Sequence, residues 1–200
     1  MQDRLFRIPQ YQRAYSWRSK HRHDLFGDIW RTWRAGDGRQ HFMATVVGLR
    51  RGKRTIVTDE HVVLDIVDGQ QRLTTLILLL KAISKELATS DSIEGKVKAE
   101  LEETLVKPDM ASLLLLQTNH DRSEYFATYL RSGSYPPSTV AKTTADRELL
   151  DAIEDCEGFV RQWRAEGNSL PELVGLLKNR LTFVFHEIDD EAVVYSVFEV

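Results

Sequence analysis

The sequence contains a single cysteine and no long hydrophobic run. Cys156, the lone cysteine, excludes an internal disulfide and any zinc site built from several cysteines. The longest uninterrupted apolar run, Leu76 to Leu80, is far shorter than the roughly 20 residues of a membrane-spanning helix. No charged and then apolar leader opens the chain. We therefore expect a cytoplasmic protein without a membrane span, with Cys156 as a packing residue inside a helix.

Several catalytic signatures are also missing. The sequence has no Gly-x-x-x-x-Gly-Lys-Ser/Thr phosphate loop, no His-Glu-x-x-His zinc motif and no Gly-x-Ser-x-Gly elbow. Its histidines show no metal-ligand spacing beyond His21 and His23, which a helix would point to different faces. These absences disfavour serine and zinc hydrolase chemistry.

Charge is unevenly distributed along the chain. The net charge is -3, but residues 1–54 carry 13 Lys and Arg against 4 Asp and Glu, whereas residues 55–200 carry 14 against 26. Eleven of the 13 basic residues are arginines, and three of the four tryptophans share their segment. Arginine with aromatic residues suits phosphate binding and base stacking, which favours a nucleotide or DNA partner. Alternatively, this basic face pairs with the acidic remainder of the same chain.

Hydrophobic spacing in the first 90 residues predicts a small sheet and two helices. Apolar residues recur at helical intervals from 25 to 33, where Ser19 is expected to cap the helix and Gly36 to end it. Runs rich in β-branched residues predict strands, and Arg51-Gly52-Lys53 predicts a turn between two of them. The expected strands are 42–49, 55–58 and 62–67, and a second helix follows the third strand.

The rest of the chain is acidic and mainly helical in pattern. We therefore predict an α+β fold with three regions: a core over 1–90, a mainly helical region over 91–180, and a strand with the start of a helix over 181–200. Residues 132–144 are the best linker candidate. The expected helices are 94–106, 122–131, 145–166, 171–179 and 191–200, and the expected strands are 113–116 and 181–188.

The segment from Asp68 to Thr75 is the strongest local signal for chemistry, because it lies where a strand leads into a helix. A helix N-terminus offers unpaired N–H groups and a partial positive charge, which favour a phosphate. Gly69 permits close approach of the backbone, and Arg72 can bind phosphate oxygens through two hydrogen bonds. Asp68 could hold a metal ion or orient a water. Alternatively, Asp68 and Gly69 form a plain turn and helix cap.

A second signal lies in the segment from Ile8 to Trp17. Tyr11, Tyr15 and Trp17 are interleaved with Gln12 and Arg13, and such a set can line a pocket that stacks a base or contacts a phosphate. The same aromatic residues could equally anchor the N-terminal segment to the core.

Together these motifs resemble the N-terminal domain of GmrSD-type modification-dependent restriction systems, which has a ParB/sulfiredoxin-like fold. The resemblance rests on three patterns, which stand in the family's order and at its separation. They are Ile8-Pro9-x-Tyr11-Gln12-Arg13-x-Tyr15-x-Trp17, His41-Phe42-Met43-Ala44-Thr45-Val46-Val47, and Val67-Asp68-Gly69-Gln70-Gln71-Arg72-Leu73-Thr74-Thr75-Leu76.

The resemblance implies a domain that binds and hydrolyses a nucleoside triphosphate in anti-phage defence and gates a His-Asn-His nuclease domain that cuts modified DNA. An alternative is a DNA-binding or modification-sensing module without turnover of its own. The implied catalytic residues are Asp68, Gln71 and Arg72, with Mg2+ at Asp68. The implied nucleotide-binding residues are Gly69, Gln70, Gln71, Arg72, Thr74 and Thr75. The implied pocket for DNA or another ligand contains Tyr11, Gln12, Arg13, Tyr15 and Trp17.

Two departures from the family pattern limit this transfer. Ala44 stands where glycine is usual, and this could narrow the approach of the backbone to a ligand. A Phe-Glu-x-x-Asn-x-Arg-Gly motif is cut off after Val200, so we expect hydrolysis and cleavage to need parts that these 200 residues lack.

Overall fold

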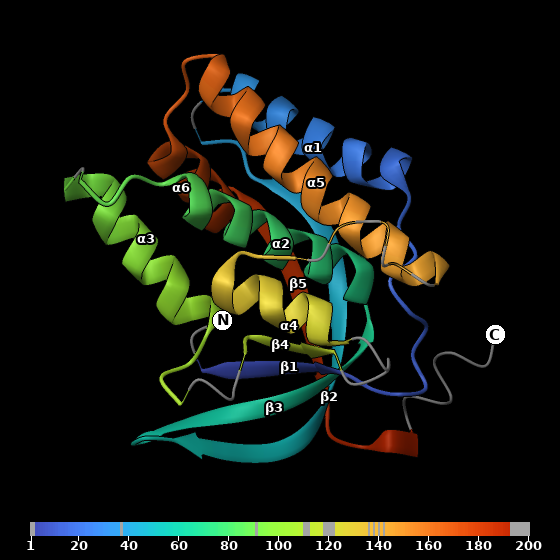
Figure 1. Ribbon diagram of the computed structural model, residues 1–200. Coiled ribbons are helices and arrows are strands. Elements are labelled where there is room, and N and C mark those ends of the chain that lie inside the picture. Colours follow the sequence, from blue (N-terminus) through green and yellow to red (C-terminus); the bar gives the residue numbers. More distant parts are fainter. Residues whose placement is uncertain are drawn as a thin grey trace.

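A computed structural model describes residues 3–36, 38–90, 92–109, 113–117, 123–135, 137, 139, 141 and 143–192. These residues form a mixed sheet with helices packed against it (Figure 1), which confirms the predicted α+β class. The strands are β1 (Arg4–Ile8), β2 (His41–Ile56), β3 (Asp59–Asp68), β4 (Leu115–Gln117) and β5 (Leu181–Ile188). The helices are α1 (Ser19–Arg34), α2 (Gln70–Glu86), α3 (Ser92–Leu105), α4 (Ser123–Ser132), α5 (Thr144–Ala165) and α6 (Leu170–Asn179).

The strand order in the sheet is β4-β1-β3-β2-β5. β1 is parallel to both β3 and β4, β2 and β3 are antiparallel, and β2 is parallel to β5. The strand predicted at 181–188 therefore forms one edge of the sheet, and β4, which follows α3, forms the other.

Strand β2 is longer than the sequence pattern suggested, and the predicted turn at Arg51-Gly52-Lys53 is wrong. The strand continues through Gly52 with a register shift, and the chain reverses only at Val57 and Thr58. Gly52 has a φ of +120°, so its conformational freedom is used for a bulge inside the strand rather than for a reversal.

Register shifts in β2 let the sheet curl. Its first half pairs with β5 and its second half with β3, with irregularities in both pairings. Strand β5 consequently comes back towards β1, where the rings of Phe6 and Phe185 lie 5.7 Å apart although three strand pairings separate β1 from β5. The Cβ of any larger residue at Gly48 would lie 3.1 Å from the Phe185 ring, so the ring would have to shift by a few tenths of an ångström to accept it.

Helix α2 lies at the centre of the helical layer (Figure 1) and contacts α3, α4, α5 and α6. Most of its residues are buried because its pattern is apolar on nearly all sides. One hydrophobic core combines side chains from both 1–90 and 91–180. Cys156 is fully buried in this core, which confirms its predicted packing role.

An aromatic cluster joins α1 to α5. Trp30 stacks on Trp163 with ring centroids 4.5 Å apart, and Phe26 stacks on Phe159 at 4.6 Å. Trp33 also contacts Trp163, at 5.2 Å. The two α1 tryptophans therefore pack in the core rather than forming ligand platforms, as their helical spacing predicted.

Local helix boundaries differ little from the predicted ones. Ser19 is the first residue of α1 and Arg18 is the N-cap, one position earlier than expected. The helix predicted over 191–200 lies outside the described residues beyond Ala192. Among the helices of the described ranges, none combines the length and apolar character needed to cross a membrane.

We expect Trp163→Ala to lower the free energy of unfolding by about 3 to 5 kcal/mol, because it opens a cavity under three aromatic rings and removes the Nε1 donor to the Ser169 carbonyl. Val184→Ala, at a half-exposed strand position, serves as the control and should change it by less than about 0.5 kcal/mol. Urea denaturation of both variants measures the difference; similar losses would contradict this account of the core.

Candidate functional site

The turn between β3 and α2 requires glycine at position 69. β3 ends at Asp68, and Gly69 is the N-cap of α2 with a left-handed φ of +84°. A Cβ at this position would lie 3.0 Å from Cγ2 of Val46 and 3.2 Å from the carbonyl oxygen of Thr45. Gly69 thus satisfies two needs at once, an unusual backbone angle and close packing against β2.

The N-terminus of α2 is not capped by a side chain of any described residue. The first backbone bond of the helix runs from the N–H of Leu73 to the carbonyl of Gly69. The N–H groups of Gln70, Gln71 and Arg72 consequently have no acceptor within the helix. Asp68 does not act as the side-chain cap that the alternative interpretation required, so this end of α2 carries the partial positive charge of an open helix terminus.

Three glutamines attach the N-terminal segment to this junction. Gln12 donates from Nε2 to the carbonyl of Val67 at 2.9 Å, and Gln70 donates from Nε2 to the carbonyl of Arg13 at 3.1 Å. Gln71 forms the third attachment, accepting from the N–H of Ser16 at 2.8 Å and donating to the carbonyl of Ala14 at 3.0 Å. The two signals found in the sequence therefore form one structural unit.

A pocket of about 230 Å³ lies at this unit. Its walls are Gln12, Arg13, Trp17 and the residues 67–72. The volume is below the roughly 300 to 1,000 Å³ of pockets that enclose a whole drug-sized ligand. A larger ligand could therefore place only part of itself inside this pocket.

Arg72 is the cation best placed to act in this pocket. Its guanidinium lies over the ring of Trp17, 5.5 Å from the centroid. No carboxylate among the described residues forms an ion pair with it. The N–H edge of the group remains available for an anion, and stacking restricts the orientations of the side chain.

Gln70 contains a buried acceptor that lacks a hydrogen bond. The side chain is only 6% exposed, and Oε1 has no partner in the described structure. The carbonyl of Arg13 fixes the orientation of the Gln70 amide. This carbonyl accepts a hydrogen bond, so Nε2 and not Oε1 must face it. Burying an unpaired amide oxygen is costly, so Gln70 keeps an unsatisfied polar group beside the pocket.

Other predicted site residues lie away from the pocket walls. Tyr15 is buried, and its hydroxyl donates to Oγ1 of Thr75 at 2.8 Å, because Oγ1 itself donates to the carbonyl of Gln71. Burial raises the pKa of Tyr15. Thr74 is buried as well, whereas Tyr11 is 60% exposed. Tyr15 and Thr75 therefore join the N-terminal segment to the core, and their predicted contacts with a ligand remain predictions.

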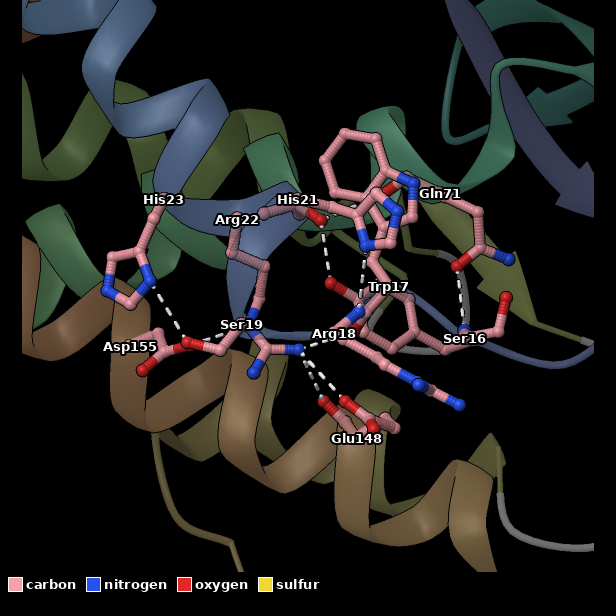
Figure 2. A network of polar contacts seen from close by, with 12 residues as sticks. Ser16, Trp17, Arg18, Ser19, His21, Arg22, His23, Gln71, Glu148 and Asp155 are labelled. Atoms are coloured by element: carbon pink, nitrogen blue, oxygen red, sulfur yellow. Dashed lines mark hydrogen bonds and ion pairs between the residues drawn. The ribbon is translucent and has the colours of Figure 1, made fainter.

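Sequence reasoning did not identify Arg22, which contacts the backbone of Trp17 (Figure 2). Arg22 is almost completely buried and donates to the carbonyl of Trp17, to Asp155 at 2.6 Å and to Glu148 at 3.2 Å. The ring of His21 stacks on Trp17 at 5.9 Å. A signal was present, since Arg22 stands three residues before Leu25 and seven before Ile29, on the buried face of α1.

Many arginines of the basic first quarter pair with acidic groups of this chain. Glu187 of β5 accepts hydrogen bonds from Arg4 at 2.7 Å and Arg50 at 2.6 Å, and these arginines lower the pKa of its carboxyl group. Arg51 contacts Glu191 at 2.9 Å. Further pairs join Arg7 and Arg51 to Asp65, Arg22 to Glu148 and Asp155, and Arg54 to Asp109. The charge asymmetry of the sequence therefore reflects internal pairing to a large extent.

The pocket offers one carboxylate for a metal ion. Asp68 lines it, and the described residues contain no group of three or more His, Cys, Asp or Glu side chains that could hold a metal. Mg2+ typically binds one or two carboxylates and completes its coordination with phosphate oxygens and water. The donor set therefore fits Mg2+ that arrives with a phosphate ligand, with Asp68 as the protein group that would hold it.

The fold and the pocket define a mixed α/β domain with an open helix N-terminus and an arginine that no described carboxylate pairs, both suited to binding an anion. The family model for the N-terminal domain of the GmrSD restriction endonuclease matches residues 1–200, so the chain belongs to this family and is a component of a restriction system. No curated protein sequence matches the chain.

We expect Gly69→Ala to lower the free energy of unfolding by about 1 to 3 kcal/mol, because it combines left-handed strain with the close contacts to β2. Gly167→Ala is a matched control, since Gly167 has a φ of +82° and only open space where a Cβ would lie. Thermal or urea unfolding should show a smaller loss for the control. Equal losses in the two variants would show that the close approach of Gly69 to β2 contributes nothing to the free energy of unfolding.

Proposed function

We propose that the pocket at the N-terminus of α2 binds the phosphate chain of a nucleoside triphosphate and supports its hydrolysis. The observation that carries this proposal is the convergence of three groups: the uncapped N–H groups of α2, the guanidinium of Arg72, and the unsatisfied Oε1 of Gln70. The first two favour a multiply charged anion. The third is a buried polar group at the pocket wall that lacks a hydrogen-bond partner in the described structure.

In this proposal, the protein promotes hydrolysis mainly by positioning the reacting groups and by stabilising negative charge on the phosphates. Water adds to the γ-phosphorus and gives up a proton to a phosphate oxygen, while the bond to the β–γ bridging oxygen breaks and the nucleoside diphosphate leaves with the bonding electrons. The negative charge is spread over the phosphate oxygens. Arg72 and the helix N–H groups stabilise that charge, and Asp68 orients the water or would hold Mg2+. Bound Mg2+ would supply neutralisation of phosphate charge.

The proposal assigns Gln71 a positioning role. Both ends of its amide are engaged, by Ser16 and Ala14, so it keeps the N-terminal segment against the pocket. Through these hydrogen bonds, a change at the start of α2 would displace the segment that contains Arg13 and Trp17. We propose that nucleotide hydrolysis acts through this contact to gate cleavage by a His-Asn-His nuclease domain in the whole restriction system.

We expect Arg72→Ala to weaken binding of a fluorescent triphosphate analogue by about 10- to 100-fold, because it removes a charge-assisted hydrogen-bonding group. In the full-length protein, turnover should fall with it. Arg72→Lys should restore only part of the affinity, since a lysine cannot present a planar fork.

Arg34→Ala is the matched control for this experiment, because Arg34 also lies over a tryptophan ring, at 5.2 Å from the Trp30 centroid, but in the last turn of α1. The control should bind nucleotide like the unmodified protein. Equal affinity and equal turnover for Arg72→Ala and the unmodified protein would overturn the role of Arg72.

A second candidate function is DNA binding or sensing of a DNA modification without turnover. The exposure of Tyr11 and the position of Arg13 at the pocket favour it, because an exposed ring can stack on a base and an arginine can contact the backbone. The internal pairing of Arg4, Arg50 and Arg51 makes a broad DNA-binding face over those residues less favourable.

We expect Arg13→Ala to weaken DNA binding and to reduce the salt slope of log K by about 1, if Arg13 contacts a phosphate. Arg31→Ala provides the control, since Arg31 is exposed and pairs with Asp28 of its own helix. Fluorescence anisotropy with modified and unmodified duplexes at several salt concentrations makes the measurement. Affinity that does not change with salt would rule out this second function.

A further inference from the structure

A buried charge cluster connects α5 to the wall of the candidate pocket. Arg22 of α1 has a side chain that is only 2% exposed, and it pairs with two carboxylates of α5 (Figure 2). Its Nε donates to Asp155 at 2.6 Å, and its Nη1 lies 3.2 Å from a carboxylate oxygen of Glu148. The same Nη1 donates to the carbonyl of Trp17, which is a wall residue of the pocket. Helix α5 contributes no residue to the described pocket walls, so this cluster reaches the pocket through Trp17.

The attachment of α1 to α5 does not need this cluster. Phe26 stacks on Phe159 in the aromatic cluster that already joins the two helices. Removing a guanidinium from water is costly, and a buried ion pair seldom stabilises a fold more than well-packed apolar side chains would. Apolar side chains cannot donate to a carbonyl, however. The specific effect of Arg22 is therefore to fix the backbone of Trp17.

The ring of Trp17 supports Arg72. The guanidinium of Arg72 lies over this ring, 5.5 Å from its centroid. The ring of His21 stacks on it as well, with the centroids 5.9 Å apart and the planes inclined by 18°. Trp17 lies in the connection between β1 and α1, so neither a strand nor a helix sets its position. The hydrogen bond from Arg22 gives this residue a fixed point.

We propose that Arg22 is a positioning residue for the pocket, because it fixes Trp17 in the place where the indole ring supports Arg72. Arg22 is held in turn by Glu148 and Asp155 of α5. This inference rests on the proposed function, in which Arg72 binds the phosphate chain. A guanidinium that is already oriented on a ring loses less conformational freedom when it binds an anion. The affinity of the pocket therefore depends on a helix outside it.

The competing explanation is that Arg22 only ties α1 to α5. Phe26→Leu is the matched control for Arg22→Met, because it weakens the same attachment and leaves the hydrogen-bonding group of Arg22 in place. Both variants should be less stable than the unmodified protein. At a temperature where both are folded, Arg22→Met should bind a fluorescent triphosphate analogue about 5- to 20-fold more weakly, and Phe26→Leu should bind it normally. Equal affinities for the two variants would overturn the proposal.

A double-mutant cycle with Trp17→Leu separates positioning from a structural effect. Trp17→Leu removes the ring and should weaken binding of the analogue by a similar factor. When the ring is absent, adding Arg22→Met should weaken binding no further, because Arg22 acts through this ring. Two effects that multiply would show that Arg22 influences the pocket by another route, and the proposal would be wrong.

A titration of the unmodified protein, followed by 1H–15N NMR of side-chain signals, gives a result even if Arg22→Met does not fold. A triphosphate analogue that cannot be hydrolysed should shift the Nε–H signal of Arg72 and the indole N–H signal of Trp17. It should also slow hydrogen exchange at Nε–H of Arg22. A shift at Arg72 without any change at Trp17 or Arg22 would overturn this inference alone. No binding and no shift at Arg72 would overturn the proposed function as well.

Discussion

The close approach of Gly69 to β2 is the constraint on which the rest of this structure depends. A left-handed residue that touches Thr45 and Val46 sets the direction in which α2 leaves the sheet. That direction places the apolar surface of α2 among four other helices and leaves its N-terminus open. The same residue therefore determines both how the core is filled and where an anion can meet free N–H groups.

Hydrophobic spacing predicted most elements of this fold. The buried side chains of a helix recur along the sequence at a different interval from those of a strand. The strand at 181–188 and the helices after residue 90 follow from that spacing alone. The prediction of a turn at Gly52 was wrong. A glycine in the sequence indicates a backbone that can adopt unusual angles, but it does not indicate whether a bulge or a chain reversal uses them. Register and curvature arise from contacts distant in sequence, such as Phe6 with Phe185, so spacing could not reveal them.

In the candidate site too, some features follow from local sequence patterns, and others depend on contacts between residues far apart in the sequence. A strand leading into a helix through Gly69 is a local pattern, so the open N-terminus could be predicted. The roles of Gln71 and Arg22 depend on partners far along the chain, namely the 14–16 segment and α5. Composition alone also overstated the basic character of the first quarter, because Glu187 and Glu191, which neutralise its arginines, come more than 130 residues later.

Strand β2 has a consequence for the order in which the molecule assembles. Its second half meets β3 through a short reversal, with Ile56 opposite Asp59, whereas its first half meets β5, with Val46 opposite Phe185. Closing the first of these loops costs little chain entropy, and closing the second costs more and must wait for the intervening helices. Loop-closure entropy therefore predicts that one half of this continuous strand pairs early and the other half pairs late.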